Sequence, residues 1–307
     1  MIEISHVTRC LGSLIQTNED ISADVGWSAQ EIEEKTGIKQ RYIALESEST
    51  ESLALNAVSE IESHELLDLD LIISVTNTPS ISFPAIANLV HSEFFTDKNI
   101  QTIGLNAGCS GFVDALDIVY KFFKAGGSKK ALIVTSDTYQ KFIPKSDRSI
   151  RTLFSDGACA TLVKHNSCSL RLASSIYTSH PKTNDFLTMK KLENQDTIFM
   201  NGPHVLNFSL KVIKEISANL DLAQPTLIFA HQAGKIILSN LQKKVDTIHK
   251  LPINYQNYGN LVSSSIPNLL SEYMPIIKNF NNVLFSGFGV GLKHTSLLFH
   301  NDNFKQS

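Results

Sequence analysis

Short apolar segments that favour β-strands recur along this chain and alternate with segments that favour helices. The expected strands are Leu71–Val75, Ala131–Thr135, Ala158–Lys164, Thr226–Ala230, Val283–Ser286 and Ser296–Phe299. The best helical pattern follows Cys109 and ends at Gly126 and Gly127. Its apolar side chains recur at helical spacing, at Phe112, Leu116, Val119 and Phe123. This alternation of strands and helices is typical of a layered α/β protein, which is the fold class we predict.

The two halves of the sequence repeat one order of elements: a strand, a loop that contains glycine, a helix and another strand. The loop surrounds Cys109 in the first half and is Tyr258-Gly259-Asn260 in the second half. The intervals between the elements are similar, which favours an internal duplication. Chance similarity is the alternative, because any α/β chain contains such pairs of segments.

Cys109 lies in the segment 106–111, Asn-Ala-Gly-Cys-Ser-Gly, at the start of the predicted helix. Its small neighbours permit a tight turn and leave room for a substrate. Unpaired backbone N–H groups and the positive end of the helix dipole favour a thiolate at such a position. Cys109 is therefore a candidate nucleophile. The alternative is a small buried hydrophobic residue, which is our interpretation of Cys10, Cys159 and Cys168.

His231 and Asn260 are two further polar residues at positions where α/β proteins place their sites. His231 follows the strand Thr226–Ala230, and such folds bind ligands at the carboxyl ends of their strands. Asn260 follows Gly259 and precedes a serine-rich helix start. Taken singly, each residue has an ordinary explanation, as a buried histidine with satisfied hydrogen bonds and as a turn asparagine.

Composition narrows the class of protein. The 307 residues carry a formal net charge of -3 and would bury a sizeable core in one large domain or two fused ones. No stretch dense in lysine and arginine occurs, which argues against nucleic-acid binding. No apolar run approaches the roughly 20 residues that span a bilayer, and the first residues do not have the pattern of a signal peptide. The four cysteines have no metal-ligand spacing, so we expect no metal site and a reducing, cytoplasmic location.

Together and in this order, the three polar residues resemble the Cys-His-Asn triad of the β-ketoacyl-acyl-carrier-protein synthase III family, in the thiolase superfamily. They lie in Gly108-Cys109-Ser110-Gly111, His231-Gln232-Ala233 and Tyr258-Gly259-Asn260. Other segments are similar to further motifs of the family: Thr36-Gly37-Ile38 through Ala44, Ser155-Asp156-Gly157-Ala158 and Gly287-Phe288-Gly289-Val290-Gly291. The similarity extends over nearly the whole chain.

This resemblance implies a duplicated thiolase-like fold of five layers, α-β-α-β-α, with the active site between the two halves. Residues 1–165 would form the half that carries the nucleophilic cysteine, and residues 166–307 the half that carries the histidine and the asparagine. The resemblance also implies a homodimer, in which Phe83 would close the acyl pocket of the partner subunit. An acyl carrier protein is the expected partner.

The resemblance also implies a chemical role for each residue. Cys109 would take an acyl group from a thioester, and a malonyl-type thioester would then lose CO2 to give an enolate that attacks this group. His231 and Asn260 would donate hydrogen bonds to the thioester oxygen on which charge grows. The backbone N–H groups of Cys109 and Val290 would form the oxyanion hole, and Phe288 would lie beside the nucleophile. No cofactor is implied, because acyl-coenzyme A and acyl-carrier-protein thioesters are substrates.

The chain departs from the family on the side that binds the nucleotide of coenzyme A. Glu31 stands where the family usually has a tryptophan that stacks on the adenine. Lys35, Arg148 and Lys235 are the basic residues expected to contact the substrate or carrier. We therefore expect a preference for carrier-protein donors. The alternative is that Trp27 supplies the missing ring through a shifted loop.

A second departure is Val290, which replaces a glycine of the family's C-terminal loop, so that its Cβ narrows the backbone conformations available there. Such changes suggest a specialised relative with its own acyl donor, in fatty-acid-like or polyketide biosynthesis.

Four alternatives remain. A biosynthetic thiolase needs a second cysteine near the C-terminal loop, but none follows Cys168. Plant-type polyketide synthases have longer chains. An acyltransferase of this fold would pass the acyl group to an alcohol or amine, against which Asn260 argues. A non-catalytic partner subunit commonly lacks the nucleophile, whereas Cys109 is present.

Overall fold

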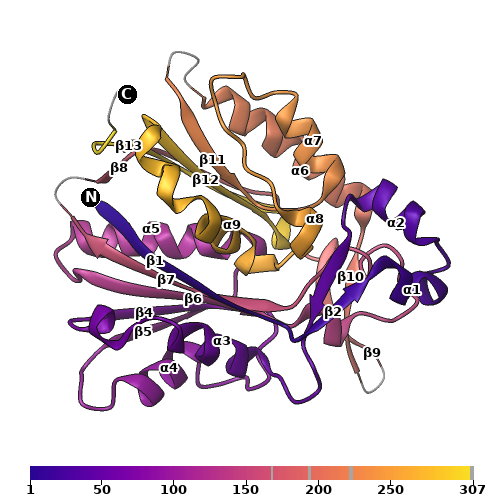
Figure 1. The fold of residues 1–307 in the computed structure, drawn as a ribbon, viewed down its shortest axis with the longest axis horizontal. Helices are drawn as coiled ribbons and strands as arrows, with labels where there is room; N and C mark the ends of the chain where they lie inside the picture. Colours follow the sequence, from indigo (N-terminus) through magenta and orange to yellow (C-terminus); the bar gives the residue numbers. More distant parts are fainter. Residues whose placement is uncertain (167–168, 193–194, 221–223, 305–307) are drawn as a thin grey trace.

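A computed structural model describes residues 1–166, 169–192, 195–220 and 224–304, so Cys168 lies outside the described residues. Nine strands form one sheet in the order β11-β12-β13-β8-β1-β7-β6-β4-β5. A single residue pair, Ile2 with Leu170, joins β1 to β8. The sheet therefore has two parts, β11-β12-β13-β8 and β1-β7-β6-β4-β5, which are joined at this pair and are called the second and the first sheet below (Figure 1).

The first sheet belongs to the N-terminal half. Its strands are β1 (Ile2–Leu11), β4 (Leu71–Val75), β5 (Gln101–Leu105), β6 (Lys130–Asp137) and β7 (Gly157–His165). Strand β4 pairs in parallel with β5 and β6, and β7 pairs antiparallel with β6 and β1. The helices of this half are α3 (Thr50–Ser59), α4 (Ile86–Phe94) and α5 (Gly111–Lys124).

The second sheet repeats this topology with one strand fewer. Its strands are β8 (Leu170–Ser179), β11 (Thr226–Ala230), β12 (Asn282–Gly289) and β13 (Lys293–Asn301). Strand β11 is parallel to β12, as β4 is to β6 in the first sheet. Strand β13 is antiparallel to β12 and β8, as β7 is to β6 and β1. An isolated parallel bridge between Leu227 and Lys250 stands in the place of β5. The helices are α6 (Gly202–Ala218), α7 (Lys235–Gln242) and α9 (Ser265–Tyr273).

Three hydrophobic clusters define five layers. Helices α5 and α9 lie between the two sheets, where Phe112 of α5 and Leu269 of α9 pack with Phe285 of β12. Helices α3 and α4 cover the outer face of the first sheet, and α6 and α7 cover the outer face of the second. This arrangement confirms the predicted five-layered, duplicated α-β-α-β-α fold.

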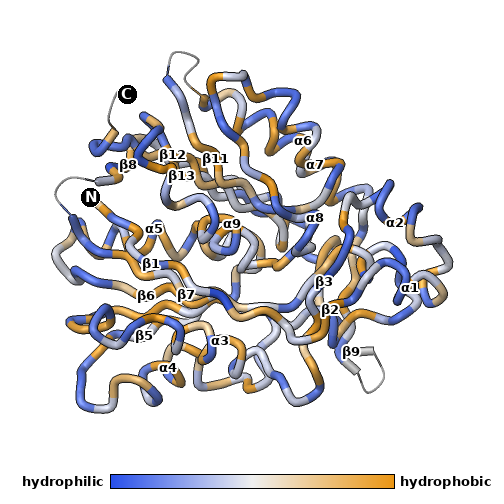
Figure 2. Tube along the Cα trace, in the orientation of Figure 1, coloured by the Kyte–Doolittle hydropathy of each residue, from blue (hydrophilic) through white to orange (hydrophobic). Residues whose placement is uncertain are grey.

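Alternating side chains connect each sheet to the layers on both of its faces. On β6, Leu132 packs with the outer helices and Ile133 with the central ones. On β12, Leu284 packs with the outer helices and Phe285 with the central ones. Because both faces are covered, these strands are mainly apolar, and Figure 2 shows hydrophobic colour on parts of both sheets.

Smaller elements surround the carboxyl ends of the strands. They are β2 (Leu14–Thr17), α1 (Asn18–Val25), α2 (Ala29–Thr36), β3 (Gln40–Ile43), the hairpin of β9 (Leu187–Leu192) and β10 (Gln195–Met200), and α8 (Tyr255–Tyr258). The Asp156 carboxylate accepts hydrogen bonds from the backbone N–H groups of Ala44, which follows β3, and of Gln140, each at 2.9 Å. The turn Ser155–Ala158 therefore joins two segments far apart in the sequence.

The six strands expected from the sequence are present, and the predicted helix after Cys109 is α5. Strands β1, β5 and β8 were not predicted. Strand β7 ends at His165 and β8 begins at Leu170, while the division into halves at residue 165 stays a prediction. Within the described ranges, no helix combines the length and the apolar character needed to cross a bilayer.

Candidate active site

Cys109 lies in a short 3-10 turn, Gly108–Ser110, that connects β5 to the N-terminus of α5. The turn depends on Gly108, which has a φ of +52° and therefore a backbone that other residues rarely adopt. A Cβ at Gly108 would also lie 2.5 Å from Oδ1 of Asn77. Cys109 is buried, with 4% of its surface exposed.

His231 comes from the second half and follows β11 directly. Its backbone N–H donates to the carbonyl of Ser286 on β12, at 2.9 Å. The Phe288 ring meets the imidazole edge to face, with centroids 5.6 Å apart. These two contacts hold a buried imidazole whose Nδ1 has no hydrogen-bond partner among the described residues.

Asn260 lies in the loop between α8 and α9, the second-half counterpart of the Cys109 loop. Its backbone pairs with the segment at Phe154 through two hydrogen bonds of 2.9 Å, from Asn260 N to Leu153 O and from Ser155 N to Asn260 O. Its side-chain Oδ1 accepts a hydrogen bond from the N–H of Val262, at 2.9 Å. The amide Nδ2 is therefore the group that Asn260 can offer to a ligand.

The end of β12 approaches the nucleophile closely. A Cβ at Gly289 would lie 3.0 Å from the Cys109 sulfur, and a Cβ at Gly287 would lie 2.7 Å from Cα of Ser110. The backbone N–H of Val290 faces the sulfur, together with that of Cys109 itself. Val290 is not among the residues with positive φ, so its Cβ fits this loop, and its side chain packs against Gly108.

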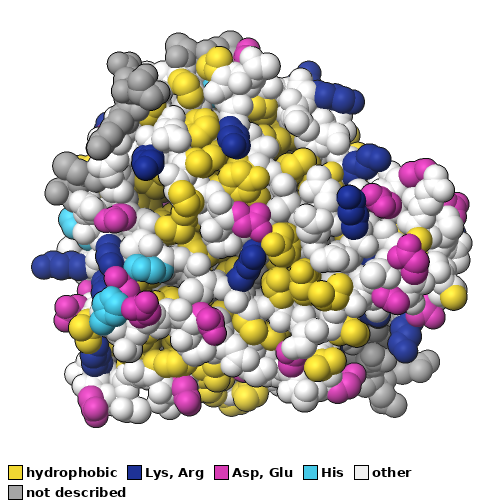
Figure 3. All heavy atoms as spheres, in the orientation of Figure 1, with side chains coloured by type: hydrophobic (Ala, Val, Ile, Leu, Met, Phe, Trp, Pro, Cys, Tyr) yellow, Lys and Arg dark blue, Asp and Glu magenta, His cyan; other side chains and the backbone are white. Residues whose placement is uncertain are grey.

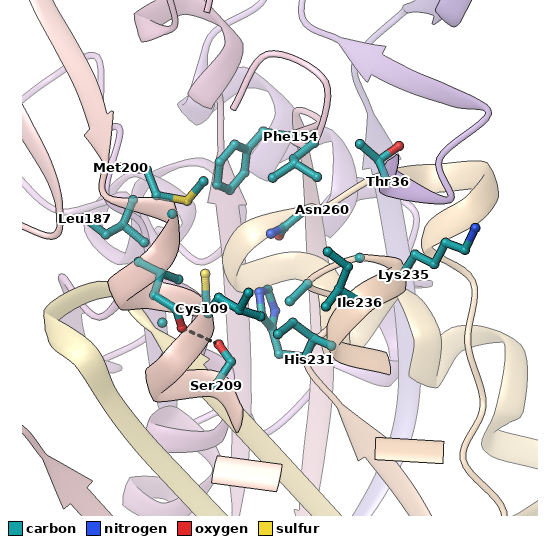
Figure 4. Close-up of a pocket in the computed structure, with 18 of the residues that line it drawn as sticks. Thr36, Cys109, Phe154, Leu187, Met200, Ser209, His231, Lys235, Ile236 and Asn260 are labelled. Atoms are coloured by element: carbon teal, nitrogen blue, oxygen red, sulfur yellow. Dashed lines mark hydrogen bonds between the residues drawn. The ribbon is translucent and has the colours of Figure 1, made fainter. Parts of the chain in front are cut away.

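The three predicted catalytic side chains line one pocket with a volume of about 220 Å³. Figure 4 shows the sulfur of Cys109, the imidazole of His231 and the amide of Asn260 around its centre. The other walls are largely apolar and include Leu187, Met200 and Phe154. The pocket therefore combines a thiol, an imidazole and an amide in largely apolar surroundings.

Burial determines the charge state of the thiol. It raises the pKa of Cys109 to about 12, with a smaller contribution in the same direction from the Asp137 carboxylate. The N–H groups of Val290 and Cys109 oppose this shift without overcoming it. The N–H groups thus favour the thiolate, as the sequence predicted, but desolvation of the buried sulfur has the larger effect.

His231 is neutral for the same physical reason. Burial lowers the pKa of its imidazole to about 3. A neutral imidazole carries one N–H donor and one acceptor nitrogen, so near neutral pH it can donate a hydrogen bond but cannot serve as a fixed positive charge.

Three basic residues were predicted to contact the substrate or carrier. Lys35 and Lys235 contribute to the lining of the pocket, and the Lys235 ammonium donates to the carbonyl of Glu34, at 2.9 Å. Arg148 lies over the ring of Trp27, 5.3 Å from its centroid, and the Lys35 ammonium lies 5.1 Å from the same centroid. Trp27 is thus the aromatic ring that contacts Lys35 and Arg148.

Glu31 has a structural role at the start of α2. Its carboxylate accepts hydrogen bonds from the backbone N–H and the hydroxyl of Ser28, both at 2.8 Å, in a capping box. These hydrogen bonds lower the pKa of Glu31. The Ser-x-x-Glu spacing was a readable signal for this cap in the sequence. Glu31 therefore caps α2, and the alternative in which Trp27 supplies the ring stays a prediction.

Phe83 lies apart from the pocket and is 84% exposed. Its predicted contact with a partner subunit stays a prediction.

On the face shown in Figure 3, basic and acidic side chains are interspersed and form no continuous basic band among the described residues. Across the described ranges, no group of three or more His, Cys, Asp and Glu side chains is arranged to hold a metal ion.

Asp137 is a residue of this site that the sequence analysis missed. It ends β6, is fully buried, and accepts hydrogen bonds from the N–H of Asn77 at 2.8 Å and from the hydroxyl of Ser263 at 2.5 Å. Burial raises the pKa of Asp137 to about 6. Its position two residues after the predicted strand Ala131–Thr135 was the available signal, similar to the one that identified His231.

Cys10 and Cys159 differ from each other. Cys159 is buried on β7, as expected, whereas Cys10 is only partly buried on β1. Neither lines the pocket of Cys109.

Comparisons with known proteins agree with this geometry. Residues 103–181 match the model of 3-oxoacyl-[acyl-carrier-protein] synthase III, and residues 217–300 match the model of its C-terminal part. The β-ketoacyl-[acyl-carrier-protein] synthase III of Streptococcus sanguinis is 34% identical, over 96% of this chain and 98% of that protein. The corresponding Streptococcus pneumoniae enzyme is 32% identical over the same shares.

Solved structures have the same fold. The crystal structure of 3-oxoacyl-[acyl-carrier-protein] synthase III from Aquifex aeolicus has a TM-score of 0.87 and 28% identity, covering 98% of this chain and 100% of that one. A priming β-ketosynthase from the R1128 polyketide biosynthetic pathway has a TM-score of 0.86 over 98% of this chain and 97% of that one, and at 22% identity it shows the fold alone. Identity above 30% over nearly the full length of both chains makes the relationship plain: this chain belongs to the β-ketoacyl-acyl-carrier-protein synthase III family.

Proposed function

We propose that this protein is a condensing enzyme that loads an acyl group onto Cys109 and then joins it to a malonyl-type thioester with loss of CO2. One observation carries the proposal: Cys109 from one half and His231 and Asn260 from the other line a single buried pocket. In this role the protein is an acyltransferase of fatty-acid or polyketide biosynthesis.

In the first half-reaction the Cys109 sulfur attacks the carbonyl carbon of an acyl thioester. The new S–C bond forms, the old C–S bond breaks, and the departing thiol takes up the proton that Cys109 loses. The N–H groups of Cys109 and Val290, which face the sulfur, would donate to the carbonyl oxygen while it carries negative charge. Burial raises the pKa of the Cys109 thiol, so the sulfur has to lose its proton in the course of this half-reaction.

In the second half-reaction the malonyl-type carboxylate leaves as CO2, and its electron pair forms an enolate. The enolate oxygen would accept hydrogen bonds from the imidazole N–H of His231 and from Nδ2 of Asn260, which its own loop leaves available. The enolate carbon then attacks the acyl carbonyl, and the Cys109 sulfur leaves and regains a proton. The apolar walls favour CO2 loss, because they solvate the carboxylate poorly.

The mouth of the pocket suits a long, negatively charged donor. Lys35 and Lys235 line it and Arg148 lies near it across Trp27, so an acidic carrier protein or the phosphates of coenzyme A would meet positive charge there. The named relatives are β-ketoacyl-[acyl-carrier-protein] synthases III, which supports a carrier protein as partner. The exposed Phe83 supports a homodimer in which each subunit contributes to the other's site.

Transfer of the acyl group to an alcohol or amine is the second candidate. This reaction requires Cys109, but Asn260 has no catalytic role in it. The available Nδ2 of Asn260, beside a neutral histidine, favours decarboxylative condensation instead.

The buried thiol leads to a pH prediction. The rate of Cys109 alkylation by iodoacetamide, followed on the Cys109 peptide by mass spectrometry, should rise about tenfold per pH unit from about pH 6 to about pH 10, because the thiolate fraction grows in this way below the pKa. Cys109→Ala gives the background from partly buried Cys10. An alkylation rate that levels off below about pH 8 would show that the N–H groups and the helix dipole stabilise the thiolate more than burial destabilises it.

The division of roles can be tested by separating the half-reactions. His231→Ala and Asn260→Ala should each lower CO2 release from a malonyl thioester by about 10²–10³-fold, since each removes one donor to the enolate, and should change acylation of Cys109 much less. His64→Ala removes an imidazole on the protein surface and is the matched control. Equal losses in both half-reactions would place the two residues in nucleophile activation or in general structure.

Trp27 should determine the use of coenzyme A donors. Trp27→Ala should lower kcat/KM for an acyl-coenzyme A by about 10- to 100-fold, through loss of ring stacking on the adenine, and affect the matched carrier-protein donor little. Trp27→Phe keeps a ring and serves as the control for packing against Ile21, Val25 and Ile32. Equal loss with both donors would mean that Trp27 only stabilises α1 and α2.

A further inference from the structure

His294, near the start of β13, is a buried ionisable side chain that the proposed mechanism does not use. It is 0% exposed, although an imidazole loses its hydrogen bonds with water when it is buried. It lies directly across from Phe288 on β12, and the Phe288 ring packs beside the imidazole of His231. His294 is not among the described residues that line the pocket, so it does not contact a substrate bound there.

Both ring nitrogens of His294 have polar partners. Nδ1 lies 2.8 Å from Oε2 of Glu215 on α6, and Nε2 lies 3.0 Å from the hydroxyl oxygen of Ser286 on β12. Burial lowers the pKa of His294, with Glu215 acting in the opposite direction, so the imidazole is neutral at neutral pH. Because a carboxylate only accepts, the ring proton is on Nδ1, and Nε2 accepts the hydroxyl hydrogen of Ser286. The two hydrogen bonds therefore fix the orientation of the ring.

Both partners of His294 are themselves held in place. The hydroxyl of Thr178 on β8 donates to the same carboxylate oxygen of Glu215, at 3.2 Å. Ser286 is 0% exposed, and its backbone pairs with Ala230 of β11 and with Ser296 of β13. The hydrogen bonds from Glu215 through His294 to Ser286 thus join α6 to β8, β13 and β12.

Two contacts lead from these hydrogen bonds to His231. The carbonyl of Ser286 accepts from the backbone N–H of His231 at 2.9 Å, so Ser286 contacts His294 with its side chain and His231 with its backbone. The Phe288 ring meets both imidazoles edge to face, with its centroid 5.6 Å from that of His231 and 6.4 Å from that of His294. A displacement of His294 would therefore reach His231 by both contacts.

Packing alone does not account for a histidine at this position. A phenyl ring of similar volume would fill the same space and would not require the desolvation of two ring nitrogens. What the imidazole adds is direction, because its two hydrogen bonds select one ring orientation and one tautomer.

Building on the proposed function, we propose that His294 is a positioning residue for His231. With Glu215, it holds the Ser286 carbonyl and the Phe288 ring, and these two groups direct the His231 imidazole toward the enolate oxygen. His294 acts in the second half-reaction, because in the proposed mechanism His231 has no role in the transfer of the acyl group to Cys109.

The two half-reactions, measured separately, test the proposal. Acylation of Cys109 is followed by mass spectrometry of the intact protein with a panel of acyl thioesters on coenzyme A and on a carrier protein. Decarboxylation is followed by the release of labelled CO2 from the malonyl thioesters of the same two carriers. His294→Phe keeps a ring and removes both hydrogen bonds, and Ser286→Ala removes one. Each should lower CO2 release about 10-fold, because a displaced catalytic group is less effective, and leave the acylation rate nearly unchanged.

His300→Phe is the matched control. His300 is a partly buried residue of the same strand, and its Nδ1 lies 2.8 Å from Oδ1 of Asn282, at the end of β12 that is remote from the site. This substitution should leave both half-reactions unchanged. Circular dichroism verifies that each variant is folded, and Ser286→Ala, the smaller change, decides the test if His294→Phe does not fold.

Combination with His231→Ala separates positioning from general stability. In the His231→Ala background, His294→Phe should change the remaining CO2 release by less than about twofold, because its effect passes through His231. A residue that only stabilises the fold would lower the rate by the same factor in both backgrounds.

The possible failures are distinguishable. If His294→Phe and Ser286→Ala release CO2 at the wild-type rate, or lose both half-reactions equally, the inference is overturned and the proposed function stands. The same holds if the loss in His294→Phe persists in full in the His231→Ala background. If no thioester acylates Cys109 in the wild-type protein, or no CO2 is released, the proposed function fails and the inference fails with it.

Discussion

The close approach of β12 to the Cys109 turn is the contact on which the rest of the site depends. Gly287 and Gly289 lie so near to Ser110 and Cys109 that a Cβ at either position would collide with them. This approach brings the Val290 N–H from the second half to a sulfur from the first half. The two N–H groups that we propose as the oxyanion hole therefore face the same sulfur only when the two halves are packed together.

Polar contacts fix the same junction. The Asp137 carboxylate of the first half accepts the hydroxyl hydrogen of Ser263 from the second half, and Thr135 shares a hydrogen bond of 2.8 Å with Ser264. The backbone of Asn260 pairs with residues 153–155. Because these groups are buried, an unmet hydrogen bond here would be costly, so the network positions Asn260 relative to Cys109. Burial also leaves the site with uncharged groups, a thiol and a neutral imidazole, until substrate arrives.

Local pattern explains what the sequence could predict. The strands Leu71–Val75 and Thr226–Ala230 are short and mainly apolar, so both could be predicted from the sequence. The order of the motifs brought Cys109, His231 and Asn260 together in one candidate site. Properties that depend on packing between distant segments could not be predicted from the sequence. The pKa of Cys109 depends on burial by both halves, the contact of Trp27 with Arg148 joins residues far apart in sequence, and so does the hydrogen bond of His294 with Glu215.

The central claim is that Cys109 carries the acyl group, and peptide mapping by mass spectrometry after incubation with acyl thioesters tests it most directly. The account predicts one added acyl mass on the peptide that contains Cys109, removed by hydroxylamine and absent from Cys109→Ala. An acyl mass on the peptide of Cys159 or Cys168, or acylation that persists in Cys109→Ala, would contradict it.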